Sequence, residues 1–124
     1  MAYQLTELQE KWLTALESGE YAQCKGSLHR GAGYCCLGVL CVVSGREFNE
    51  QGFCEERNQV LPSSVREESR LRDSSGESLA TFHIGDMRFS QLTEANDSGH
   101  TFAQIAAAIR ANPENFFLPN EVAP

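Results

Sequence analysis

An α+β fold is expected from this sequence: a single compact domain, mostly short helices around a buried central helix, with a small antiparallel sheet. Three observations predict it. First, an apolar run at 33–45 is too short to cross a bilayer and is therefore expected in the core. Second, apolar residues at helical spacing, preceded by capping residues, occur near both ends of the chain. Third, segments 27–30 and 79–84 have strand-like composition. Of the 124 residues, 41% are hydrophobic, which is enough apolar material for one globular domain over residues 1–124.

The first helix is predicted up to residue 18. Thr6 is its expected N-cap, and Gln9 three residues later completes a capping box. Ser18-Gly19 ends it. The apolar residues of the segment fall on one face: Leu5, Leu8, Trp12, Leu13 and Leu16. Because this start is amphipathic and lacks a basic region followed by an apolar stretch, we expect no signal peptide and a location in the cytoplasm.

The central helix is predicted from the run Gly33-Tyr34-Cys35-Cys36-Leu37-Gly38-Val39-Leu40-Cys41-Val42-Val43-Ser44-Gly45. Cysteine and glycine are poor helix formers, but a dozen apolar residues closed by Ser44-Gly45 favour a buried helix with a glycine C-cap over a strand. The run holds three of the five cysteines in one short element, which is a poor layout for a disulfide framework. We therefore expect reduced thiols that pack as small hydrophobes.

The other elements are short. The strand at 27–30, followed by the turn Gly31-Ala32-Gly33, is expected to pair with the strand at 79–84, which ends at the turn Gly85-Asp86. Helices are predicted after Pro62, at 90–96, and from Thr101, whose capping box uses Gln104. Segments 46–60 and 70–78 are predicted loops, and the tail at 114–124 is expected to lie extended over the core or to be partly disordered.

The net charge of the chain limits the classes of partner that we expect it to bind. With 17 acidic and 10 basic residues the net charge is −7, so the protein repels nucleic acids and anionic membranes, and we expect it to bind neither directly. An acidic surface keeps a protein soluble, and it also suits docking onto a basic protein surface. Both interpretations stay open at this stage, as does the choice between a monomer and a homo-oligomer.

Five segments carry a resemblance: Leu16-Glu17-Ser18-Gly19-Glu20-Tyr21, Lys25-Gly26-Ser27-Leu28, Gly33-Tyr34-Cys35-Cys36-Leu37-Gly38-Val39-Leu40-Cys41, Leu61-Pro62-Ser63-Ser64-Val65, and residues 92–106. In this order they resemble a family of small uncharacterised proteins from tailed bacteriophages and prophages. The resemblance implies an origin and no site residues. It implies an accessory protein that acts by binding, either inhibiting a host protein such as a defence factor or sequestering a small nucleotide signal.

A glycine-rich loop at 26–33 precedes the predicted central helix. Such a loop before a helix N-terminus can present backbone N–H groups to a phosphate. Basic side chains lie beside these glycines, and nearby aromatic rings could stack on a base. The spacing matches no established phosphate-binding motif, so a plain flexible loop is the alternative. The candidate ligand-binding residues are Tyr21, Lys25, Arg30 and Tyr34.

A small cysteine hydrolase is the alternative from another functional class. Cys35 or Cys36 in the first helical turn would have a lowered pKa, His83 could act as the base, and Asp86 or Asn96 could orient it. The doubled cysteine in an apolar run is explained more simply by packing, so we expect a protein that is not an enzyme. The cysteine and histidine spacing does not fit a zinc site, and we expect no metal and no cofactor.

Overall fold

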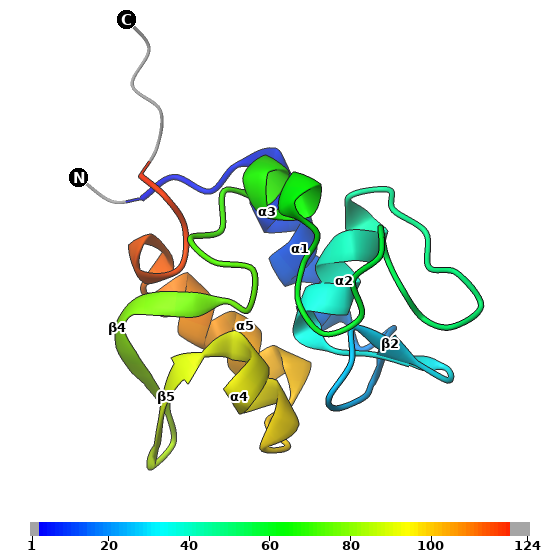
Figure 1. Ribbon diagram of the computed structural model, residues 1–124. Coiled ribbons are helices and arrows are strands. Elements are labelled where there is room, and N and C mark those ends of the chain that lie inside the picture. The colour runs from blue at the N-terminus through cyan, green and yellow to red at the C-terminus, as the bar shows by residue number, and fades with distance from the viewer. Residues whose placement is uncertain (1–2, 120–124) are drawn as a thin grey trace, which may run out of the picture.

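The computed structural model describes residues 3–119, and it confirms the α+β class (Figure 1). One cluster of buried side chains forms the core of this part of the chain. None of its helices is long and apolar enough to span a bilayer. The helices are α1 (Glu7–Ser18), α2 (Cys36–Val43), α3 (Ser63–Ser69), α4 (Leu92–Asp97), α5 (Phe102–Ala111) and the 3-10 helix η1 (Pro113–Asn115). The strands are β1 (Ala22–Gln23), β2 (His29–Arg30), β3 (Gly33–Tyr34), β4 (Glu77–Ile84) and β5 (Met87–Gln91).

Both predicted capping boxes are confirmed. In α1 the Thr6 hydroxyl accepts a hydrogen bond from the Gln9 N–H at 3.2 Å, and the Gln9 side chain accepts one from the Thr6 N–H at 2.8 Å. Thr101 and Gln104 repeat this arrangement at the start of α5. Gly19 ends α1 in the left-handed conformation, with φ of 77°, as expected of a glycine C-cap.

Helix α2 lies at the centre of the core and confirms the predicted buried helix. It packs against α1, α4 and β3, and its residues from Cys36 to Cys41 are buried. The indole N–H of the buried Trp12 in α1 donates to the Cys36 carbonyl at 2.8 Å. A side chain at Gly38 would place its Cβ only 1.9 Å from the Leu28 carbonyl oxygen, so the loop before β2 reaches α2 only because residue 38 is glycine. The helix ends as predicted at Ser44-Gly45: Ser44 is the C-cap, and Gly45 directly after it takes the left-handed conformation, with φ of 89°, and donates to the Val42 carbonyl at 3.0 Å.

The predicted pairing of segment 27–30 with segment 79–84 is wrong. Strand β2 pairs with β3 in antiparallel fashion, and β1 joins the other edge of β3 in parallel. Only Gly31 and Ala32 separate β2 from β3, so a two-residue turn, with Gly31 at φ of 59°, closes a local hairpin. Strand β4 instead pairs with β5 around the predicted turn at Gly85-Asp86. The helix predicted at 90–96 begins two residues later than expected, at Leu92, because residues 90 and 91 belong to strand β5.

The segment after α5 lies against the core. Phe116 and Phe117 are buried, the Leu118 N–H donates to the Arg70 carbonyl at 2.7 Å, and Phe117 forms an isolated bridge with Leu71. The rest of the predicted tail, 120–124, lies outside the described residues.

Candidate functional site

Two open hollows adjoin on one surface, and Ser27 lines both of them. The first, here called the Arg30 hollow, has a volume of about 340 Å³. The second, the Asp97 hollow, has a volume of about 330 Å³. The Arg30 hollow is lined by Ser27, His29, Arg30, Gly31, Asn49, Glu50, Gln51, Gly52 and Asn58. The Asp97 hollow is lined by Gly26, Ser27, Cys35, Gln59, Val60, Ser75, Gln91, Thr93 and Asp97.

Strand β2 supplies the two basic side chains of the Arg30 hollow. The His29 Nδ1 lies 2.7 Å from the Gly33 carbonyl oxygen, and since a carbonyl only accepts, Nδ1 carries the proton. One face of the His29 ring stacks on Tyr34, with centroids 4.3 Å apart and an interplanar angle of 17°. This packing holds the histidine ring in one orientation next to Arg30.

The 48–53 loop forms the opposite wall. The Asn49 carboxamide oxygen accepts hydrogen bonds from the N–H groups of Gln51 at 3.0 Å and Phe53 at 2.9 Å, which folds the loop into a tight turn. Gly52 has φ of 84°, and a Cβ there would lie 2.5 Å from the His29 carbonyl oxygen. The loop backbone therefore sits directly on β2. Phe48 adds a ring contact with His29 at 5.0 Å.

The four predicted ligand-binding residues fall into two groups. Arg30 lines the Arg30 hollow, Tyr34 supports it through His29, and Tyr21 packs edge-on against Tyr34 at 5.9 Å. Lys25 lies elsewhere, with its ammonium group next to Gly99 after α4. His29 and the amides of the 49–58 loop were missed as ligand-facing groups. Their only sequence signal is the turn composition Asn49-Glu50-Gln51-Gly52.

The Asp97 hollow is held together by α4. The Asn96 carboxamide oxygen accepts from the Cys36 N–H at 3.2 Å and from the Gln23 side chain at 2.9 Å, while its NH₂ group donates to the Cys24 carbonyl at 2.8 Å. The adjacent Asp97 carboxylate accepts from the Gly26 N–H at 2.9 Å. Side chains of helix α4 thus hold the 23–27 loop and the start of α2 in place by hydrogen bonds.

These bonds overturn the predicted phosphate cradle at the start of α2. The Gly26 N–H is used by Asp97 and the Cys36 N–H by Asn96. Cys35 is the N-cap of α2, and its sulfur accepts from the Gly38 N–H at 3.4 Å. The protein's own side chains therefore occupy the donors that a phosphate would need.

The predicted cysteine–histidine arrangement is also absent from the described residues. Cys35 is 3% exposed, and burial raises its pKa to about 12, although the Gly38 and Leu37 N–H groups act in the opposite direction. Burial likewise raises the pKa of the fully buried Cys36. His83 is exposed on β4 and pairs in register with Arg88 on a hairpin that projects away from α2, beyond α4 and α5 (Figure 1). The predicted lowering of the cysteine pKa is wrong because burial dominates.

The five cysteines form no disulfide, as expected for reduced thiols. Over residues 3–119, no three side chains of histidine, cysteine, aspartate or glutamate gather in the way a metal site requires.

Comparison with known proteins gives a family and no function. No curated protein and no solved structure matches the chain. A family model described as a domain of unknown function (DUF8296) matches residues 5–113, a span that includes every residue lining the two hollows. Because the match covers most of the sequence, the chain belongs to the DUF8296 family.

Proposed function

We propose that the protein acts by binding, as a phage or prophage accessory protein that inhibits a host factor, in particular a defence component, in the host cytoplasm. The observation that carries this proposal is the joined surface of the Arg30 and Asp97 hollows. Segments 26–31, 49–60 and 91–97, far apart in sequence, converge there and present amide, hydroxyl, carboxylate and guanidinium groups.

The chemistry of the surface suits a polypeptide partner. The Arg30 hollow offers one guanidinium, one carboxylate from Glu50, and the side-chain amides of Asn49, Gln51 and Asn58, which can donate to and accept from peptide groups. Arginine is enriched among the residues that dominate binding energy at protein interfaces. The net charge of −7 favours encounter with a basic partner.

The test compares two arginine variants of the full chain. Arg30→Ala removes the guanidinium of the hollow, whereas Arg88→Ala removes an exposed guanidinium on the β4–β5 hairpin and is the matched control. Tagged wild type and both variants are produced in the bacterial host, crosslinked to their neighbours and purified by the tag. Each host protein captured in this way is then purified, and its affinity for the wild type and for each variant is measured. We expect one host protein to bind the wild type and Arg88→Ala with equal affinity and Arg30→Ala at least tenfold more weakly, a difference of about 1.4 kcal/mol. Equal affinity for all three proteins would contradict the proposed surface.

A second candidate function is a sponge for a nucleotide signal, which the position of Arg30 beside the His29–Tyr34 stack favours. The guanidinium suits a phosphate, and the aromatic pair suits contact with a base. A native mass spectrum of the protein purified from its bacterial host under reducing conditions tests this function. Excess mass that matches a nucleotide, and that Arg30→Ala loses while Arg88→Ala keeps it, would support the sponge. A bare protein mass would favour the protein-directed inhibitor.

Added nucleotides provide an independent readout. A ligand at one hundred times its Kd stabilises the folded state by about 2.7 kcal/mol. For a chain of this size that is a rise in Tm of about 10 °C, which Arg30→Ala should abolish.

A further inference from the structure

A methionine and a histidine lie in contact where the β4–β5 hairpin meets the turn between α4 and α5 (Figure 1). Met87 is the first residue of β5, and His100 lies just before the N-cap of α5. The Met87 Sδ is 3.4 Å from the His100 Nε2. Met87 is 48% exposed and His100 is half-buried, so the pair lies at the protein surface.

The other ring nitrogen of His100 is held by the capping box of α5. The Gln104 carboxamide oxygen accepts from the Thr101 N–H at 2.9 Å. The His100 Nδ1 lies 3.3 Å from the same oxygen and donates to it, because an amide oxygen only accepts. In the neutral form of the ring, Nε2 is then the nitrogen that can bind a metal ion. A hydrogen bond from the second ring nitrogen to an oxygen is also what orients the histidines of known metal sites.

The ring of Phe89 fixes the histidine from a second direction. It meets the His100 ring edge to face, with centroids 5.3 Å apart and an interplanar angle of 81°. The hydrogen bond to Gln104 and this ring contact together keep Nε2 directed at the Met87 sulfur.

We propose that Met87 and His100 form a binding site for a soft monovalent metal ion, and that Cu(I) is the ion that this pair of ligands favours. Thioether sulfur selects Cu(I), imidazole also binds copper, and Mg²⁺, Ca²⁺ and Mn²⁺ prefer oxygen ligands. The expectation of no metal considered cysteine and histidine ligands, whereas this pair contains a methionine. The inference is independent of the proposed function, because the lining of the Arg30 and Asp97 hollows includes neither residue.

The distance between the two donor atoms fits one metal ion bound by both. Zinc, a first-row metal that serves here as a guide, makes bonds of about 2.0 Å to imidazole nitrogen and about 2.3 Å to sulfur. With these bond lengths, donor atoms 3.4 Å apart subtend an angle of about 104° at the metal, close to the tetrahedral angle of about 109°. Water or a small external ligand would complete the coordination. The bound ion would connect β5 to the turn before α5.

A silver titration followed by NMR tests the site in the full-length protein. Ag(I) is the probe because it shares the ligand preference of Cu(I) and is not oxidised in air. The chain has two methionines, Met1 and Met87, so carbon-13 labelling of the methionine methyl groups gives at most two signals, and Met87→Leu assigns them. All proteins carry Cys24→Ser, because Cys24 is the one cysteine that is not buried and it would compete for silver.

In this background we expect the Met87 methyl signal and the His100 ring nitrogens to shift together and to saturate at one silver ion per chain. His100→Gln should weaken silver binding at Met87 at least tenfold, since it removes one of the two protein ligands. Met87→Leu roughly conserves side-chain volume and should abolish the shift of the His100 nitrogens at the same silver concentration. His83→Gln is the matched control, because His83 is exposed on the same hairpin, and it should leave the silver affinity unchanged.

Two results would overturn the proposal. The first is a Met87 methyl signal that does not move when silver is added, a result that needs no ligand variant and so does not depend on how the variants fold. The second is an equal silver affinity at Met87 with and without His100→Gln, measured after the fluorescence of the buried Trp12 has shown that the variant is folded.

Discussion

Replacement of Asn96 by alanine is the most direct test of how the Asp97 hollow is held together. Asn96 is fully buried, and its carboxamide joins α4 to Cys36 at the start of α2 and to Gln23 and Cys24 in the β1 segment. No other side chain in residues 3–119 donates to or accepts from backbone in both of these segments. We therefore expect its loss to destabilise the whole domain.

The expected loss of stability follows from the two backbone groups that lose their hydrogen-bond partner. Asn96→Ala removes the acceptor of the buried Cys36 N–H and the donor to the Cys24 carbonyl. Each unsatisfied buried group costs about 1–3 kcal/mol, so the loss of both partners should lower the free energy of unfolding by about 2–6 kcal/mol. That is a large part of the roughly 5–15 kcal/mol that is typical of a domain.

Urea unfolding measures this change, with Trp12 as the probe. The chain has one tryptophan, which is fully buried and hydrogen-bonded to Cys36, so its fluorescence reports the packing of α1 on α2. With a slope of about 2 kcal/mol per M, the middle of the usual range, the urea midpoint should fall by roughly 1–3 M. Ser98→Ala, at the exposed end of the same helix, is the control and should change stability by less than about 0.5 kcal/mol. A shift for Asn96→Ala no larger than that of the control would refute the reasoning.

Three further predictions concern packing, surface charge and pH. Gly38→Ala should destabilise the protein by about 1–3 kcal/mol in urea unfolding, because the new Cβ would overlap the Leu28 carbonyl, and unchanged stability would contradict that contact. Arg110→Met should cost only about 1 kcal/mol, a loss that shrinks in high salt, since the ion pairs of Arg110 with α1 are partly exposed; a larger, salt-independent loss would count against this. Burial raises the pKa of Cys35 to about 12, so the unfolded chain loses this proton first. The free energy of unfolding should therefore fall as pH rises above about 8.5, less steeply in Cys35→Ala, and a pH-independent value would speak against a neutral buried thiol.

Local sequence signals were sufficient to predict helices α1, α2 and α5. A capping box involves residues three apart, so Thr6 with Gln9 and Thr101 with Gln104 predicted the starts of α1 and α5. The apolar run likewise predicted α2, because a buried helix needs apolar residues on all sides.

Strand pairing depends on contacts that no local pattern encodes. Segment 27–30 has the composition to pair with 79–84, but the short turn at Gly31-Ala32 brings β3 beside β2 at a lower cost in loop-closure entropy. Strand β5 was missed for a related reason. The alternation around the buried Phe89 is short, and it continues directly into the helical pattern that starts at Leu92.

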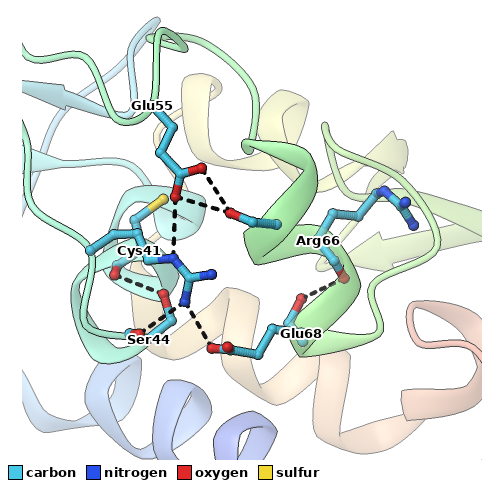
Figure 2. Close-up of polar contacts among 8 residues, drawn as sticks. Cys41, Ser44, Glu55, Arg66 and Glu68 are labelled. Carbon is cyan, nitrogen blue, oxygen red and sulfur yellow. Dashed lines mark hydrogen bonds and ion pairs between the residues drawn. The ribbon is translucent and has the colours of Figure 1, made fainter.

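The candidate site was predictable only in part. The basic and aromatic residues before α2 indicated Arg30 and Tyr34, which lie in and behind the Arg30 hollow. The opposite wall comes from a loop whose position depends on the ion pairs of Arg46 with Glu55 and Glu68 (Figure 2) and on the contact of Gly52 with His29. Both are long-range contacts, so sequence analysis treated that loop as irregular.

The cysteines at the start of α2 show how two opposing physical effects decide the role of a thiol. The positive end of a helix stabilises a thiolate by at most about 2 kcal/mol. Burial opposes it: a rise in the pKa of Cys35 to about 12 corresponds to roughly 4–5 kcal/mol against the charged form. A reactive thiol therefore needs both the helix end and access to water, and Cys35 has only the first. Its sulfur serves as the cap for Gly38. The binding surface that we propose therefore does not depend on a reactive thiol, and its polar groups come from β2, α4 and the loops beside them.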